Sequence, residues 1–322
     1  MRIILNQMVV LFLLLVVGFI GGKVKLISAE TGKFLSKIVI NITSPCTILT
    51  SVLGGEVNIT AGETVVFLLI SFLAYFLFIL FSIPVVRVLG GDKSNRGLYS
   101  YMAAFGNTAF MGFPVIIAIF GNASAFYVAL FNIPFVLLTF SVGIMLISNK
   151  AASEPGVEGP APTSGKGTAG WKFDPKILLN PMIVAAIVAT AVAVSGFKAP
   201  YVVTEPVRLL GSITTPGSML VIGATLAGVS FKEVFSEWRL YPVALIKLII
   251  QPVLTWLIFK QFIASGMLLG VLVILSGMPT AAMAAMVAIE YGGNERIASG
   301  GVSMTTLMSG VTIPLIVYLL LR

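Results

Sequence analysis

The chain has 322 residues, of which 58% are hydrophobic and only 10% are charged, and its mean hydropathy is +1.06. In water-soluble domains about a quarter of the residues are charged, so this composition excludes a soluble globule and predicts that lipid surrounds most of the chain. The net charge of +8 arises from basic residues placed between apolar segments.

These basic residues form no stripe with interleaved aromatic residues, which is the pattern that nucleic-acid binding requires, so we expect no nucleic-acid partner. The sequence contains no histidine, and Cys46 is its only cysteine. A zinc or copper site built from these side chains is therefore not expected, and we predict no metal and no cofactor.

Ten segments are predicted to cross the membrane, since a spanning helix needs about 20 mostly apolar residues. In chain order they are residues 4–22, 32–53, 64–88, 97–120, 124–147, 177–196, 204–228, 239–260, 266–290 and 296–321. The sequence thus predicts an all-α, multi-pass protein of the cell (inner or plasma) membrane.

The basic residues between these segments predict the orientation, because cytoplasmic loops are enriched in Lys and Arg. With the N-terminus outside, the cytoplasmic loops hold fourteen basic residues and the outer loops hold five. Both termini are therefore predicted to lie outside. Residues 149–176 are rich in Gly, Pro, Ala and Ser and have no apolar period, which predicts a flexible cytoplasmic linker.

The linker separates residues 1–148 from residues 177–322, and each part is predicted to contain five spans. An odd number of spans gives the two parts opposite orientations in the membrane. They share short motifs in the same order: TSPCTILTSVLGG pairs with TTPGSMLVIGATLAG, IPVVR with QPVLTW, GNTAFMGFP with SGMPTAAMAAM, and NIPFVLL with TIPLIVYLL. This pattern predicts two inverted five-helix repeats.

Proline and glycine within the fourth and ninth spans predict that both helices are broken, near residues 107–114 and near Pro279 and Thr280. Backbone groups freed by such breaks cannot face lipid. Secondary transporters built from inverted repeats bind substrate at broken helices of this kind. The competing interpretation is a simple kink, since proline and glycine are frequent in membrane helices.

These segments resemble the auxin efflux carrier family, which includes plant auxin exporters and bacterial malate or malonate permeases. GNTAFMGFP is similar to the family's Asn-Thr-x-x-x-Gly-x-Pro segment, and KLIIQPVL to its basic-residue-then-proline pattern in span eight. MPTAAMAAMVAIEYGG is similar to its ninth-span segment, and LLNPMIVAAI to the Asn-Pro start of span six. The similarity extends over essentially the whole chain.

The resemblance implies a carrier of organic anions that works as an elevator. Spans 1, 2, 6 and 7 would form a scaffold that also makes a homodimer, and spans 3–5 and 8–10 would form a transport domain around the crossed fourth and ninth spans. The resemblance also implies that Asn107 contacts the substrate. A second substrate-contacting Asn of the plant exporters corresponds here to Met182, which favours a bacterial carboxylate carrier.

The candidate substrate-binding residues are polar or helix-breaking residues of spans two, four and nine: Asn107, Thr108, Pro114, Pro279, Thr280, Asn41 and Pro45. An Asn amide can donate two hydrogen bonds to a carboxylate, although Asn in a membrane also bonds neighbouring helices. Lys247, the only basic residue well inside a span, and Glu290 are candidates for charge balance or coupling. Lys247 could instead snorkel to the cytoplasmic surface.

The sequence therefore predicts a secondary transporter of small organic anions, driven either by proton symport with the protonated substrate or by the membrane potential. The alternative is a membrane-embedded sensor or interaction protein with a transporter-like fold. A channel would need a selectivity ring, which the sequence cannot test. An enzyme is not expected, because the chain has no histidine and no paired acids within the spans.

Overall fold

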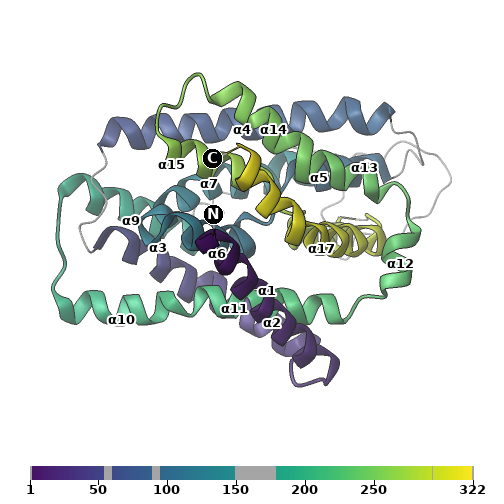
Figure 1. Cartoon of the computed structure of the whole chain (residues 1–322), viewed down its shortest axis with the longest axis horizontal. Helices are drawn as coiled ribbons and strands as arrows, with labels where there is room; N and C mark the ends of the chain where they lie inside the picture. Colours follow the sequence, from purple (N-terminus) through teal and green to yellow (C-terminus); the bar gives the residue numbers. More distant parts are fainter. Residues whose placement is uncertain (1, 54–59, 89–94, 149–178, 292, 321–322) are drawn as a thin grey trace.

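The structure is a computed structural model, and it describes residues 2–53, 60–88, 95–148, 179–291 and 293–320. These residues are largely helical and include no β-strand. Figure 1 shows the helices packed as a bundle in which many run along the long axis. The predicted all-α fold is therefore confirmed for the described part of the chain, whereas the predicted linker at residues 149–176 lies outside it.

Helices of the first part of the chain end or change type at nearly every predicted boundary. They are α1 (Arg2–Lys23), α2 (Ala29–Ile38), η1 (Val39–Thr43), α3 (Ser44–Leu53), α4 (Ala61–Val88), α5 (Arg96–Ala104), η3 (Thr108–Gly112), α6 (Phe113–Phe120), η4 (Asn122–Ser124), α7 (Ala125–Leu138), η5 (Thr139–Gly143) and α8 (Ile144–Ser148).

The second part of the chain is also divided into long and short helices. Its helices are α9 (Pro181–Ser195), α10 (Tyr201–Ser212), α11 (Thr214–Ala227), α12 (Phe231–Ser236), α13 (Leu240–Leu245), η7 (Ile246–Ile250), α14 (Gln251–Phe259), α15 (Gly266–Ser276), α16 (Met283–Glu290) and α17 (Glu295–Leu320).

Seven of the resulting helical stretches are long and apolar enough to cross a membrane by length and composition. They are Asn6–Lys23, Glu30–Leu53, Ala61–Arg87, Asn122–Ile147, Tyr201–Ala227, Leu240–Phe259 and Glu295–Leu320. Three shorter apolar helices, Thr108–Phe120, Pro181–Ser195 and Gly266–Ser276, lie within the fourth, sixth and ninth predicted segments.

Four helical segments contain a π-helical turn, and three of these turns lie just before a proline. η1 precedes Pro45, η3 precedes Pro114 and η7 precedes Pro252, in each case by two residues. A proline ring clashes with the carbonyl four residues earlier in a regular α-helix. That carbonyl lies inside the wider π turn in all three cases, so the turn lets the helix continue past the proline.

Glycines bring α1 and α11 into close contact. A side chain at Gly18 would collide with the backbone of Leu220, and one at Gly223 would collide with the backbone of Leu15. Small residues at membrane helix interfaces allow this close approach, which replaces the hydrophobic driving force that lipid removes. In Figure 1, α10 and α11 run along one side of the bundle and α4 and α14 along the opposite side.

The surface of the bundle is strongly apolar where helices face outward. Large hydrophobic side chains are exposed along α1, α4 and α10, among them Val9, Leu13, Val16, Val66, Leu69, Leu73, Val202 and Leu209. Exposed apolar area of this extent is unusual for a protein in water and fits a surface that faces lipid.

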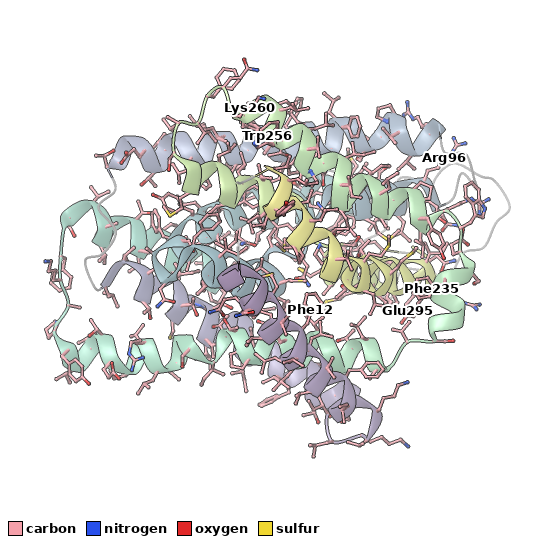
Figure 2. The ribbon with its side chains drawn as sticks, in the orientation of Figure 1. Phe12, Arg96, Phe235, Trp256, Lys260 and Glu295 are labelled. Atoms are coloured by element: carbon pink, nitrogen blue, oxygen red, sulfur yellow. The ribbon has the colours of Figure 1, made fainter. Side chains whose placement is uncertain are left out.

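Connections predicted to lie on the same side of the membrane lie in the same half of the bundle. In Figure 1 the α1–α2 turn projects at the lower right and α12 lies at the right-hand end, whereas α9 connects to α10 at the left-hand end. Figure 2 places Arg96, Phe235 and Glu295 at the right-hand end as well. The assignment of this end to the cytoplasm remains a prediction.

Candidate functional site

Two helices of the bundle are interrupted, and the interruptions lie within the predicted segments. α5 ends at Ala104, Phe105 is extended, and helical structure resumes at Thr108. α15 ends at Ser276 and α16 begins at Met283. Pro114 lies beyond the first interruption, in the first turn of α6, where proline is well tolerated.

The two interruptions pair with each other through their backbones. The Asn107 N–H donates to the Pro279 carbonyl at 2.6 Å, and the Ala281 N–H donates to the Phe105 carbonyl at 3.0 Å. Gly106 and Thr280 face each other between these bonds as an antiparallel bridge. Each interruption thus satisfies backbone groups of the other, which is required where water is scarce.

Asn107 organises the start of the helix that follows it. Its Oδ1 accepts from the Phe110 N–H at 3.2 Å, and its carbonyl accepts from the N–H groups of Met111 and Gly112. The side-chain amide nitrogen has no hydrogen-bond partner among the described residues, although Asn107 is only 4% exposed. Two amide donors are therefore left unpaired at the interruption.

Lys247 reaches the same place from η7 and is 1% exposed. Its Nζ lies 2.8 Å from Gln251 Oε1, 3.3 Å from the Ala104 carbonyl and 5.6 Å from the centre of the Phe78 ring. A Cβ on Gly106 would lie 3.2 Å from Nζ. Lys247 therefore does not snorkel to the surface. It sits at the C-terminal end of α5, where the helix dipole favours a positive charge.

Thr108 and Thr280 brace the two interruptions from within the bundle. The Thr108 hydroxyl donates to Asn132 Oδ1 at 2.8 Å. The Thr280 hydroxyl donates to the Met102 carbonyl at 3.1 Å, and its N–H donates to Thr305 Oγ1 at 3.0 Å. Both threonines are fully buried, so their hydroxyl groups hold the backbone.

Aromatic rings support the first interruption on one side. The Phe105 ring stacks on Tyr75 with centroids 6.1 Å apart and lies 4.8 Å from the Tyr101 ring. Tyr75 also packs 4.8 Å from Phe131 of α7. The rings of Tyr75, Tyr101 and Phe131 thus form a packed aromatic cluster around Phe105, and this packing holds the interruption in place.

The remaining predicted site residues lie apart from these contacts. The Asn41 side chain is exposed and donates to the Lys37 carbonyl of its own helix at 2.8 Å. Pro45, half-buried, opens α3 beside a buried hydroxyl cluster in which Thr47 Oγ1 donates to Thr214 Oγ1 at 2.7 Å. The side chain of Glu290 lies outside what the structure describes.

Sequence reasoning missed the role of Thr305. It belongs to a run of small hydroxyl residues on α17, and its Oγ1 accepts from the second interruption while donating to the Gly301 carbonyl. The sequence did contain a signal for this role, because α17 follows the second interruption and is rich in Ser and Thr. In the described part of the chain, no three His, Cys, Asp or Glu side chains are grouped to hold a metal ion.

Comparison with known proteins places the chain in a family. The family model described as "Membrane transport protein" matches residues 3–317. The chain belongs to this family. It is the auxin efflux carrier family that the motifs resemble, and its members are membrane transport proteins.

Individual relatives are distant but cover the chain well. "Uncharacterized transporter MJ1031" of Methanocaldococcus jannaschii is 24% identical over 99% of both chains. "Uncharacterized transporter YfdV" of Escherichia coli K12 is 20% identical over 98% of this chain and 96% of its own. A Rhizobium meliloti protein named "Putative malonate transporter" is 24% identical over 69% of this chain and 67% of its own.

Proposed function

We propose that this membrane transport protein is a secondary carrier of small carboxylate anions. The observation that carries the proposal is the pairing of two helix interruptions beside the unpaired amide donors of Asn107. Broken helices bind anions in transporters because the first N–H groups of a helix lack intrahelical acceptors and carry the positive end of its dipole.

Both interruptions offer such a helix start. η3 and α6 follow the first, and α16 follows the second without a side-chain capping bond. A dicarboxylate of the malonate type suits this arrangement, since one carboxylate accepts from the Asn107 amide while the other lies near the start of α16. The name of the Rhizobium meliloti relative supports this choice of substrate.

In this proposal Lys247 supplies a fixed positive charge that offsets the negative charge of the bound anion. Its ammonium group forms no ion pair with a carboxylate among the described residues. The charge is therefore not neutralised within the site, and it attracts an anion to the interruptions. This single charge offsets one of the two negative charges of a bound dicarboxylate.

The fold behind the proposal has ten spans in two inverted repeats, residues 1–148 and 177–322. α1, α3, α9 and α11 belong to a scaffold, through which two copies associate, and the interrupted helices belong to a transport domain that moves against it as an elevator. The close contact of α1 with α11 supports a rigid scaffold.

Uptake of labelled malonate into proteoliposomes under a set membrane potential tests the proposal. Asn107→Asp keeps the oxygen that caps Phe110 but removes the amide donors and adds a negative charge. Losing a hydrogen bond to a charged group costs about 1.5–3 kcal/mol, so we expect uptake to fall about ten- to hundredfold.

Asn107→Ser is a second test variant that removes the amide without adding a negative charge, and serine also caps a helix start well. We expect its thermal stability to equal that of the parent and its uptake to fall as in the Asp variant. Parent-level uptake by both variants would remove Asn107 from the site. Malonate binding without any uptake by the parent would favour the sensor alternative.

A further inference from the structure

The turn between α1 and α2 combines exposed lysines with exposed apolar side chains. Four lysines and only one acidic residue lie between positions 23 and 38, and all five are exposed: Lys23, Lys25, Lys33, Lys37 and Glu30. Val24, Leu26 and Phe34 are also exposed, Leu26 to 78%. We name residues 23–38 the hairpin tip. Figure 1 shows the α1–α2 turn projecting from the lower right of the bundle.

The lysines of the hairpin tip have no acidic partner. None of the four forms an ion pair within the part of the chain that the structure describes. The Lys23 ammonium lies 5.5 Å from the centre of the Phe19 ring on its own helix, a contact that leaves its charge unneutralised. Four positive charges are therefore available to an anion outside the protein.

Lys25 adopts a backbone conformation that is unfavourable for a residue other than glycine. Its φ of 61° makes it the only non-glycine residue with positive φ among the described residues. The Lys25 N–H donates to the Gly22 carbonyl and the Ile27 N–H to the Gly21 carbonyl, which fixes this turn. Glycine adopts the conformation without strain, so a lysine here points to a function of its charge.

The hairpin tip is firmly joined to the rest of the protein. α1 packs on α11 so closely that a side chain at Gly22 would collide with Ala227, just as one at Gly18 would collide with Leu220. A ligand bound at the hairpin tip is thereby attached to α1 and α11 together.

We propose that the hairpin tip is a docking surface for the headgroups of anionic phospholipids. The lysines bind the phosphate groups, while Val24, Leu26 and Phe34 enter the boundary between headgroups and acyl chains. Each basic residue near an anionic bilayer raises affinity about fivefold. The predicted orientation of the chain places the hairpin tip on the cytoplasmic side. Only the choice of the cytoplasmic leaflet depends on that orientation.

The test measures lipid binding by the purified full chain in neutral detergent, by native mass spectrometry. Short-chain phosphatidylglycerol is the anionic probe and phosphatidylcholine is its zwitterionic match. Lys25→Gly relieves the backbone strain, so we expect thermal stability to be equal or higher and phosphatidylglycerol affinity to fall about fivefold. Phosphatidylcholine binding should not change.

Replacing all four lysines by glutamine should lower phosphatidylglycerol affinity at least about tenfold, whereas replacing all four by arginine should preserve it. Lys198→Gln with Lys260→Gln is the matched control, because both lysines are exposed on other connections. Its phosphatidylglycerol affinity should equal that of the parent.

Three results would overturn the inference: parent affinity in the Lys25→Gly and four-glutamine variants, an equal loss in the Lys198 and Lys260 control, or a change of oligomeric state with unchanged lipid affinity. The last would make the hairpin tip a contact between copies. None of these measurements depends on transport, so they stand apart from the test of the proposed function.

Discussion

The two helix interruptions meet at one bridge but are stabilised in different ways. The first carries its own polar side chain, Asn107, which caps the following helix and keeps its amide donors unpaired. The second has no side-chain cap, and its Thr280 N–H is satisfied by Thr305 of another helix.

The packing around the two half-helices differs as well. α6 packs against α1 and α11, whereas the main partners of α16 are α17, α5 and α8, and Met286 and Ile289 of α16 are exposed. The difference teaches that the first interruption carries the unpaired polar side chain, Asn107, whereas the second is a backbone element held by its neighbours.

Removing the positive charge beside the first interruption should have the largest effect. Lys247→Met keeps most of the side-chain volume but leaves Gln251 Oε1 and the Ala104 carbonyl without their donor. Unsatisfied buried groups cost about 1–3 kcal/mol, so we expect a lower thermal midpoint. The variant also loses the attraction between the ammonium group and the anion; a loss of about 1.5 kcal/mol or more would reduce malonate uptake about tenfold or more. Arginine at this position should retain more uptake than methionine. Equal uptake by parent and Lys247→Met would show that the charge serves stability alone.

Weakening the second interruption should have an intermediate effect. Thr305→Val keeps the shape of the side chain but removes the acceptor of the Thr280 N–H, which should cost about 1–2 kcal/mol. Thr306→Val is the matched control, since that hydroxyl bonds only the Val302 carbonyl of its own helix. Chemical denaturation of both variants checks this. Equal destabilisation by the two would mean that Thr305 does not support the interruption.

Loss of the brace on the first interruption should have the smallest effect. Thr108→Val removes the hydrogen bond to Asn132 Oδ1, but Asn107 and the aromatic cluster still hold the backbone. We expect a destabilisation of about 1 kcal/mol, smaller than that of Thr305→Val. The reverse order would contradict the view that the second interruption depends more strongly than the first on a hydrogen bond from a neighbouring helix.

Much of this arrangement could be predicted from the sequence, because proline and glycine in an apolar segment report directly on backbone conformation. That reasoning located both interruptions and singled out Asn107. It placed Pro114 at a break, whereas this proline lies in the first turn of α6, after a π turn that makes room for its ring.

Contacts between distant segments could not be predicted in the same way. Nothing in the local sequence of Lys247 shows that it packs against Gly106, since that contact depends on how η7 lies across the end of α5. The same limit applies to Asn41, whose polarity suggested a site although its side chain bonds its own helix.

The bridge between Gly106 and Thr280 has a mechanical consequence. Sliding one interrupted helix past the other would break two hydrogen bonds where no water replaces them. The two interruptions are therefore linked, and a displacement of one would carry the other with it. If the proposed carrier moves its binding site through the bilayer, the solute would meet the same set of partners at both faces.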